Sequence, residues 1–334
     1  MDIGLYRLKR GILIGVAFAI AGLLPSVVPP VTQVFAEPLR VGVNKGVHSA
    51  LIYLADAQGF FKKQGADIVV KEYEAGVLAV NDFIVDKLDI ATASDFAFVA
   101  QSLKHRDLRM PAAICMASDS ELVVRKDRGI AQPQDLKGKR IAVLRGGQTE
   151  FFLHNYLIFN RIPAGSVQIV DRTPSEMVKA MADGTIDAGL CWPPYSIQMA
   201  KQLGANGAHW PAQSGQDYYQ VLFAREGFLK NKPKTMEQFL AALSDAEGFI
   251  AKYPDRAHSV LRQRLQIAEP FLPTWSLYRF QLQLSQDLLV LMEQEAKWAI
   301  RNKLVEKRDT PNYLDFFYFQ ALDKVKAEAV SVVH

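Results

Sequence analysis

The chain has 334 residues, of which 49% are apolar and 22% are charged, and its formal net charge is +4. This length is enough for two domains with cores of their own, and the composition is that of an ordinary globular protein. The small positive excess, without any block of like charges, argues against a nucleic-acid partner.

The N-terminus is predicted to be an export signal. A basic stretch from Arg7 to Arg10 precedes an uncharged apolar run of 14 residues, Gly11–Leu24, which Pro25 ends. This run is shorter than the ~20 residues that a membrane-spanning helix needs, so a cleaved signal is favoured over a membrane anchor. We place the cut after Ala36, which makes residues 1–36 the signal peptide. The mature protein is then expected to lie outside the cytoplasm and not to span a membrane.

The same series of predicted elements occurs twice in the chain. The first copy opens with LRVGVNKGVHSALIYLA and closes with DKLDIATASDFAF. Runs of β-branched residues predict strands, and apolar residues at helical spacing predict helices with one buried face. In chain order these are strand Leu39–Val43, a helix between Ala50 and Ala57, strand Asp67–Tyr73, helix Val77–Val85, strand Leu88–Ala91 and a helix capped by Ser94 or Asp95.

Two further strands, Arg109–Ala117 and Glu121–Arg125, lead towards the second copy. It opens with KRIAVLRGGQTEFFLHN and closes with DGTIDAGLCWPPY, so that Asp187 follows Asp89 by about a hundred positions. Two similar α/β units in tandem predict two lobes with a cleft between them, and such clefts bind small molecules. The predicted elements of this copy are strand Ile141–Leu144, a helix from Gln148 or Thr149, strand Val167–Val170, a helix from Pro174, strand Ile186–Cys191 and a helix from Pro193 to Met199.

The C-terminal third is predicted to be mostly helical. Tyr218–Ala224 is expected to be a strand that returns to the first lobe, and the apolar stripes beyond it predict helices that pack on that lobe. The predicted organisation is therefore a discontinuous first lobe, residues 37–125 and 218–334, and a second lobe, residues 126–217. Cys115 and Cys191, the two cysteines of the chain, end apolar strand-like runs, which favours two buried free thiols over a disulfide.

Four loops are expected to line the cleft, because loops that follow the carboxyl ends of strands do so in open α/β sheets. Helices begin in these loops, and their free N–H groups attract anions or polar acceptors. The loops are Asn44–His48, Thr92–Asp95, Arg145–Glu150 and Cys191–Tyr195.

The side chains of these loops predict a mixed site. Lys45, His48 and Arg145 are suited to balance an acid group. Asp95 and Glu150 are suited to bind an amine, although both equally suit the first turn of a helix. Lys45 is equally interpreted as an exposed loop charge. Flat apolar faces come from Phe96, Trp192 and Tyr195.

No catalytic residue, metal or cofactor is predicted. The six histidines have no metal-ligand spacing, and the chain has no GxSxG motif. The phrase AVLRGGQT lacks the lysine and the glycine spacing of a nucleotide-binding loop.

Taken together, these phrases resemble a known family. LRVGVNKGVHSALIYLADAQGFFKKQGADIVV, KLDIATASD, GTIDAGLCWPPY and VLFAREGFLKNKPKTMEQFL look like the periplasmic solute-binding proteins of ABC importers for nitrate, sulfonate, taurine and thiamine-precursor pyrimidines. The resemblance covers nearly the whole mature chain and lies in the order and spacing of the phrases. It implies a type II periplasmic binding protein fold, with each lobe a mixed sheet flanked by helices, and a helical C-terminal extension.

The resemblance also implies a mechanism. Two crossover segments, near Val123–Asp127 and Asp217–Ala224, would act as a hinge. The lobes would close on the ligand, and the closed monomer would dock on an ABC permease in the inner membrane. Contacts are expected from the four loops, from the segment Ser118–Ser120 and from an acidic position at Asp217. The predicted ligand-binding residues are Asn44, Lys45, His48, Ser94, Asp95, Ser118, Asp119, Arg145, Gly147, Gln148, Thr149, Glu150, Trp192, Tyr195 and Asp217.

The ligand itself stays open at this point. Lys45 and Arg145 favour a small organic anion such as a sulfonate, whereas Trp192, Tyr195, Asp95 and Glu150 favour a heteroaromatic thiamine-precursor-like pyrimidine. A sensor module that reports ligand occupancy to a membrane receptor needs the same clamp. An exported enzyme is disfavoured because no catalytic motif predicts one.

Overall fold

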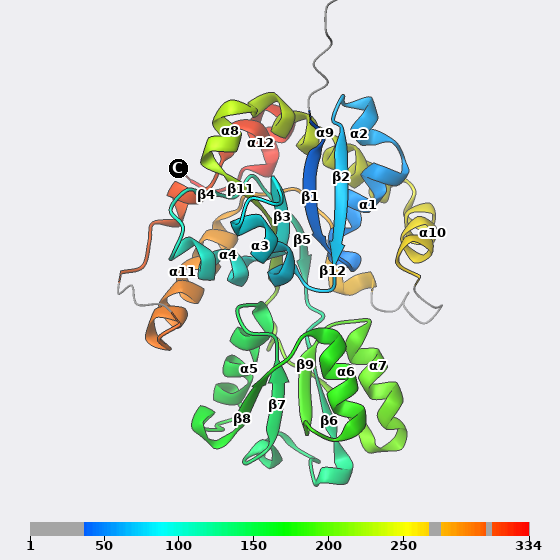
Figure 1. Ribbon diagram of the computed structural model, residues 1–334, viewed down its shortest axis with the longest axis vertical. Coiled ribbons are helices and arrows are strands. Elements are labelled where there is room, and N and C mark those ends of the chain that lie inside the picture. The colour runs from blue at the N-terminus through cyan, green and yellow to red at the C-terminus, as the bar shows by residue number, and fades with distance from the viewer. Residues whose placement is uncertain (1–36, 267–274, 305–308, 334) are drawn as a thin grey trace, which may run out of the picture. The chain divides into compact units, whose positions relative to one another are not determined.

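The computed structural model describes residues 37–266, 275–304 and 309–333 (Figure 1). The predicted signal peptide lies outside the described residues. Within them the chain forms two mixed β-sheets with helices around them, which confirms the predicted α/β class. Among the described residues, no helix is both long enough and apolar enough to cross a lipid bilayer.

The first sheet has seven strands and belongs to the first lobe. Its order is β12-β5-β11-β3-β1-β2, with β4 paired to β11. β1 pairs in parallel with β2 and β3, while β11 runs antiparallel between β3 and β5. The strands are β1 (Leu39–Asn44), β2 (Ile68–Tyr73), β3 (Ile90–Ser94), β4 (Leu108–Arg109), β5 (Ala113–Ala117), β11 (Tyr218–Arg225) and β12 (Tyr278–Arg279).

The second sheet has five strands in the order β10-β6-β9-β7-β8. β7 pairs in parallel with β8 and β9, as β1 does with β2 and β3, and β6 runs antiparallel beside β9, as β11 does beside β3. The repeat in the sequence is therefore a repeat of the sheet. The strands are β6 (Glu121–Arg125), β7 (Arg140–Val143), β8 (Gln168–Asp171), β9 (Ala188–Cys191) and β10 (Gly207–Pro211).

The chain crosses between the sheets twice, once between β5 and β6 and once between β10 and β11. Because β6 pairs with β9 and β10, residues Glu121–Arg125 lie in the second sheet, whereas the sequence assigned them to the first lobe. The crossovers therefore lie at 118–120 and 212–217, a few residues before the segments near Val123–Asp127 and Asp217–Ala224 that the sequence predicts. We propose these two segments as the lobe boundaries.

Local sequence signals start and stop the helices. In α6, Thr173 and Glu176 form a capping box, Pro174 occupies the first turn, and Gly184 ends the helix with φ 75°, a conformation that suits glycine. The helices of the two repeats are α1 (Ala50–Ala57), α2 (Phe60–Lys63), α3 (Gly76–Ile84), α4 (Asp95–Ser102), α5 (Gln148–Phe159), α6 (Pro174–Asp183) and α7 (Tyr195–Leu203).

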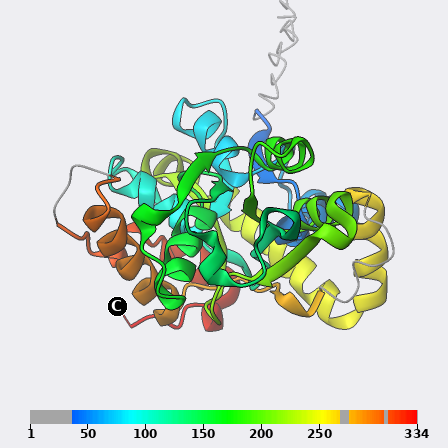
Figure 2. The same cartoon turned by 90° about the horizontal axis from the view of Figure 1, so that it is seen from below.

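The C-terminal helices share a core with the first sheet. Leu240, Leu243, Met292 and Leu322 are fully buried in one apolar cluster with residues of β1 and β3. Figure 1 shows these helices, coloured from yellow-green to red, around that sheet, and Figure 2 shows them from below. They are α8 (Glu226–Asn231), α9 (Pro233–Lys252), α10 (Pro254–Leu265), α11 (Gln286–Arg301) and α12 (Phe319–Lys326).

Trp298 of α11 contacts both lobes. Its ring centroid lies 5.4 Å from that of Phe96 in α4, 5.4 Å from that of Phe151 in α5 and 5.1 Å from that of His154 in α5. Phe96 and Phe151 stack on each other at 5.6 Å. The C-terminal extension therefore contributes to the apolar contact that joins α4 and α5.

Each lobe contains the same arginine–aspartate pair, which we call the Arg–Asp clasp. In the first lobe the Arg40 backbone N–H and Nε donate to Asp89 Oδ2, and Nη2 donates to Oδ1 at 2.8 Å. In the second lobe Arg140 donates to Asp187 through the same three groups, again with 2.8 Å to Oδ1. The clasp ties the start of β1 or β7 to the turn before β3 or β9.

Candidate ligand-binding site

A buried polar group joins three distant parts of the chain. His48 lies in the 3-10 turn Val47–Ser49 after β1, Asp119 lies in the crossover between the sheets, and Tyr278 lies in β12. His48 Nε2 is 2.8 Å from Asp119 Oδ2, and the Tyr278 hydroxyl donates to the same oxygen at 2.8 Å. Because a carboxylate only accepts hydrogen bonds, this contact places a proton on Nε2 of His48.

Two more aromatic rings complete this group, which we call the interlobe cluster (His48, Asp119, Trp192, Tyr218 and Tyr278). Trp192 follows β9 of the second sheet, and Tyr218 begins β11 of the first. Ring centroids lie between 5.3 and 6.4 Å from His48 for Tyr278, Tyr218 and Trp192. All five side chains are at most 5% exposed. The cluster therefore draws on both sheets and on one crossover.

Several polar atoms of the cluster are buried without a hydrogen-bond partner. They are Asp119 Oδ1, His48 Nδ1, Trp192 Nε1 and the Tyr218 hydroxyl, and Asn44 Oδ1 in the neighbouring loop is in the same condition. An unpartnered buried polar group costs about 1–3 kcal/mol, and protein interiors contain few of them. These five are among twelve such side-chain atoms in the described residues, and their proximity between the two sheets makes this place a candidate site for a bound molecule.

Burial keeps the tyrosines of the cluster protonated. It raises the pKa of Tyr218 and of Tyr278 well above the ordinary value, and the charge of Asp119 raises both further. Both hydroxyls are therefore donors at neutral pH. The cluster thus offers hydrogen-bond donors and acceptors together, with the rings of Trp192 and Tyr218 beside them.

The predicted cations do not belong to the buried cluster. Lys45 lies 3.7 Å from Glu72, and Arg145 Nη1 lies 3.3 Å from Glu150, with about half of each basic side chain exposed. Asp217 forms an ion pair with Arg279. The structure brings His48, Asp119 and Trp192 together and leaves the two basic side chains at the exposed ends of their loops.

The other predicted binding residues serve the local structure, mostly through hydrogen bonds to nearby backbone groups. Ser94 caps α4 by accepting the Ala97 N–H, and Asp95 accepts the N–H groups of Phe96 and Tyr219. Thr149 bonds to the backbone of Leu144, and the Ser118 N–H donates to Leu277. Gly147 caps α5 and the buried Gln148 begins that helix. Ser94 is therefore the N-cap, and Asp95 is the first residue of α4, where backbone N–H groups engage its carboxyl group without a ligand.

Tyr195 stands beside the cluster rather than in it. Its ring lies 6.3 Å from that of Trp192, edge to face, and burial raises its pKa to about 12. It therefore supports the Trp192 ring and keeps its hydroxyl proton at neutral pH.

Sequence reasoning missed Tyr218 and Tyr278. Tyr218 was assigned to the returning strand but not to the site, although it is the first residue of that strand, where the chain leaves the crossover. Tyr278 lies in a two-residue strand that pairs Tyr278 with Ala117 of β5. A strand this short has no periodicity that would reveal it.

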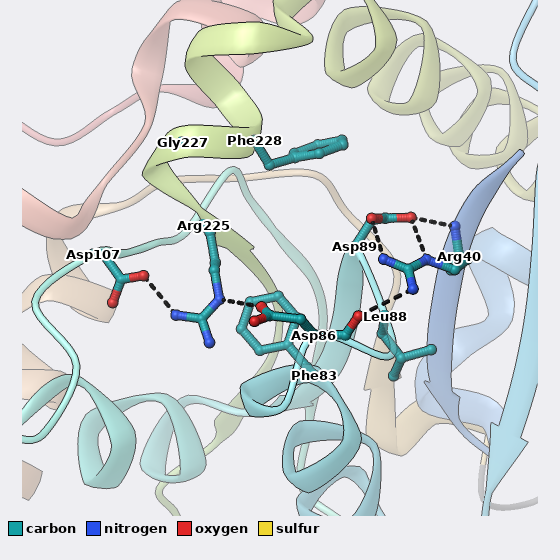
Figure 3. A pocket seen from close by; sticks show the side chains of 9 residues that line it. All are labelled: Arg40, Phe83, Asp86, Leu88, Asp89, Asp107, Arg225, Gly227 and Phe228. Atoms are coloured by element: carbon teal, nitrogen blue, oxygen red, sulfur yellow. Dashed lines mark hydrogen bonds and ion pairs between the residues drawn. The ribbon is translucent and has the colours of Figure 1, made fainter. Parts of the chain in front are cut away.

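A separate pocket of about 220 Å³ lies in the first lobe (Figure 3). It is lined by the clasp of Arg40 and Asp89 and by Arg225, which bonds to Asp86 at 3.0 Å and to Asp107 at 2.5 Å. Since its guanidinium groups are already paired with carboxylates, this pocket offers a ligand little free charge. The described residues contain no group of three or more His, Cys, Asp and Glu placed to hold a metal ion. Cys115 and Cys191 are free and buried, as predicted.

Comparison with known proteins places the chain in a family. The sequence model described as NMT1/THI5 like matches residues 47–257, more than half of the chain. The chain belongs to the NMT1/THI5-like family. The match includes His48, Asp119, Trp192 and Tyr218 of the cluster and ends before Tyr278.

Individual relatives are binding proteins. The taurine-binding periplasmic protein of Escherichia coli (strain K12) is 24% identical over 224 residues, which are 67% of this chain and 69% of that protein. The alkanesulfonate-binding protein SsuA from Xanthomonas axonopodis pv. citri, solved with MOPS bound, superposes with a TM-score of 0.72 at 18% identity, over 85% of this chain and 99% of SsuA.

These likenesses confirm the predicted periplasmic binding protein fold. The same fold also occurs in an enzyme, since the desulfurization enzyme DSZB matches with a TM-score of 0.62 at 13% identity, over 87% of this chain and 99% of DSZB. The fold alone therefore fixes no activity, and the function has to be argued from the site.

Proposed function

We propose that the protein is the extracytoplasmic solute-binding component of an ABC-type importer, which closes two lobes on a small organic anion such as a sulfonate and delivers it to a permease. The observation that carries this proposal is the interlobe cluster, in which residues from both sheets bury polar atoms without partners. The sulfonate class is supported by the relatives named above.

The cluster suits this role because its members come from parts that can separate. Asp119 lies in a crossover segment, while His48 and Trp192 follow strands of different sheets. A rotation about the crossovers at 118–120 and 212–217 would part Trp192 from His48 and admit a ligand. Closure would then remove the ligand from water and give the unpartnered atoms their hydrogen bonds.

A pyrimidine related to thiamine precursors is the second candidate ligand. It is favoured by the rings of Trp192 and Tyr218, which lie within 6.4 Å and 5.8 Å of His48, because a flat ring gains stacking energy between such faces. The predicted loop residues remain proposed contacts of either ligand, with the interlobe cluster at the centre of the site.

The remaining features follow from the same proposal. We place the mature protein in the periplasm, with the signal cut after Ala36, as a monomer that acts without a cofactor and without catalysis. A membrane receptor would replace the permease as partner if the protein is a sensor. Removal of a neighbouring permease gene would abolish uptake under the importer proposal and leave uptake unchanged under the sensor proposal.

Calorimetric titration with sulfonates, nitrate, carboxylates and pyrimidines tests the ligand class. We expect the protein to bind a sulfonate. We expect Trp192→Ala to weaken that binding at least tenfold, since the indole contributes ring contact and an N–H donor. Binding of a pyrimidine alone would replace the first candidate by the second. A protein that binds no member of the panel would contradict the proposed ligand classes.

A further inference from the structure

Asp119 has one oxygen held by the protein and one oxygen that nothing holds. His48 Nε2 and the Tyr278 hydroxyl both contact Oδ2 at 2.8 Å. Oδ1 has no hydrogen-bond partner, although Asp119 is only 1% exposed. The two contacts on Oδ2 fix the orientation of the carboxylate, so the free oxygen has a fixed direction.

A free carboxylate oxygen discriminates between ligands by charge. A carboxylate only accepts hydrogen bonds, and so does a sulfonate group, so the two repel each other when water is excluded. An N–H group, above all a cationic one, would form a short charge-assisted hydrogen bond with Oδ1. Lys45 and Arg145 do not remove this requirement, because Glu72 and Glu150 already engage them.

We propose that Asp119 is a specificity-determining residue whose Oδ1 accepts an N–H of the ligand, so that the transported molecule is an amino-bearing organic acid rather than a simple sulfonate. This inference rests on the proposed function and narrows its ligand class. The acid group would meet the donors of the same cluster, Trp192 Nε1 and the Tyr218 hydroxyl, which are also unpartnered. A donor and an acceptor side in one buried site fit a zwitterion.

Tyr278 is the positioning residue for Asp119. It lies beyond residues 47–257, the part of the chain that matches the family, in the C-terminal segment that belongs to neither repeat. Its strand, β12, pairs with β5 and places Tyr278 opposite Ala117. Ala117 lies two residues before Asp119 in the sequence. The C-terminal segment thus supplies the Tyr278 hydroxyl that holds Asp119 Oδ2 in place. The selectivity of Asp119 therefore depends on a residue that lies outside both repeats.

Matched ligand pairs test this proposal by calorimetry on the full mature chain. Taurine is compared with ethanesulfonate, and 4-aminopyrimidine with pyrimidine, because the members of each pair differ in the amino group. The wild-type protein is expected to bind an aminated member about 10- to 100-fold more tightly, the effect of one charge-assisted hydrogen bond. Asp119→Asn should abolish most of that preference, and Tyr278→Phe should reduce it severalfold.

Tyr313→Phe is the matched control. Tyr313 is also buried, and its hydroxyl lies 3.2 Å from the Ser102 hydroxyl in the first lobe, so the substitution removes a comparable hydrogen bond away from the cluster. It should leave the ratio of affinities unchanged, and thermal unfolding checks that all variants fold. Equal binding of both members of a pair would overturn the role of Asp119 and leave the proposed function standing. Binding of none of the four would contradict the role of Asp119, and binding of no member of the wider panel above would contradict the proposed function as well.

Discussion

The two lobes hold the same clasp in different surroundings. Arg40 with Asp89 and Arg140 with Asp187 form the same three hydrogen bonds. The residue three positions before the clasp aspartate has a left-handed backbone in both lobes, but it is Asp86 with φ 59° in the first and Gly184 with φ 75° in the second. The repeat therefore preserves the backbone geometry and the ion pair, while the side chain at the turn differs.

The side chain at this turn makes a contact in the first lobe that glycine cannot make in the second. Asp86 bonds to Arg225 at the end of β11 (Figure 3), which links the first repeat to the returning strand. In the second lobe the guanidinium of Arg140 bonds to the Gly184 carbonyl, as Arg40 bonds to that of Asp86. In the second lobe Arg125, at the end of β6, bonds to the Met181 carbonyl, so what the first lobe adds is the ion pair between Asp86 and Arg225.

The largest expected loss of stability concerns Trp298, which contacts both lobes. Trp298→Ala should lower the free energy of unfolding by about 3 kcal/mol, because it leaves a cavity against Phe96 and Phe151. Chemical denaturation measures the loss. A change below about 1 kcal/mol would show that the C-terminal extension does not stabilise the contact between α4 and α5.

The clasps should be unequal in strength. Asp187→Ala is expected to cost about 2 kcal/mol and Asp89→Ala about 1 kcal/mol, since the side chain of Asp187 is 10% exposed and that of Asp89 is 20% exposed. The comparison requires urea unfolding of both variants under one condition. Equal losses would show that burial does not set the strength of the clasp.

The clasp should also depend on acidity. Hydrogen bonds from Arg140 lower the pKa of Asp187 below its ordinary value, against the opposing effect of burial. Its stabilisation is therefore complete above about pH 4, the ordinary pKa of an aspartate, and is lost as the pH falls through the lowered pKa. The difference in melting temperature between wild type and Asp187→Ala should shrink below pH 4, and a difference independent of pH would contradict the ion pair.

Substitutions at the turn before each clasp test whether its left-handed backbone is strained. Gly184→Ala should cost about 1 kcal/mol, because residues with a Cβ resist the left-handed region. Asp86→Gly relieves the same strain but loses the contact with Arg225, so its free energy of unfolding should stay within about 0.5 kcal/mol of wild type. Thermal unfolding of both variants measures these changes. An unchanged stability of Gly184→Ala would show that a Cβ causes no strain at this turn.

The smallest effect concerns a carboxyl pair of the first lobe. Burial raises the pKa of Asp95 to about 7, and burial together with the charge of Asp95 raises the pKa of Glu295 well above its ordinary value. A raised carboxyl pKa destabilises the fold as pH rises from about 4, where the unfolded carboxyl ionises. Glu295→Gln should therefore be up to about 1 kcal/mol more stable at pH 7 and equal to wild type at pH 4. A variant less stable at pH 7 would contradict this account.

The sequence predicted the repeated elements because each repeat carries its own periodicity and caps. Strands β1 and β7, the cap of α4 and the start of α6 at Pro174 follow directly from local residues, and so does the free state of the cysteines. It misplaced β6 because Glu121–Arg125 is apolar enough to suit either sheet, and only its pairing with β9 decides. Strand β10 went unpredicted, since Gly207 and Pro211 are poor strand residues.

The site was predictable only in part, for the same reason. His48 and Trp192 lie in loops whose position follows from the strands before them, and Asp119 was expected from the resemblance alone. Tyr278 is separated from Asp119 by 159 positions, and nothing in its neighbourhood indicates a site. Oδ1 of Asp119 is free because His48 and Tyr278 both bond to Oδ2. No local sequence pattern shows which of the two oxygens the protein bonds.

Native mass spectrometry of the protein purified without unfolding tests the central claim, that the interlobe cluster holds a small solute, most directly. The account predicts a small molecule that leaves on mild unfolding, that carries nitrogen, and that is missing from Asp119→Asn but present in Tyr313→Phe. A protein from which no small molecule leaves on unfolding would contradict the claim, and the same molecule bound equally to wild type and Asp119→Asn would place the ligand away from Asp119.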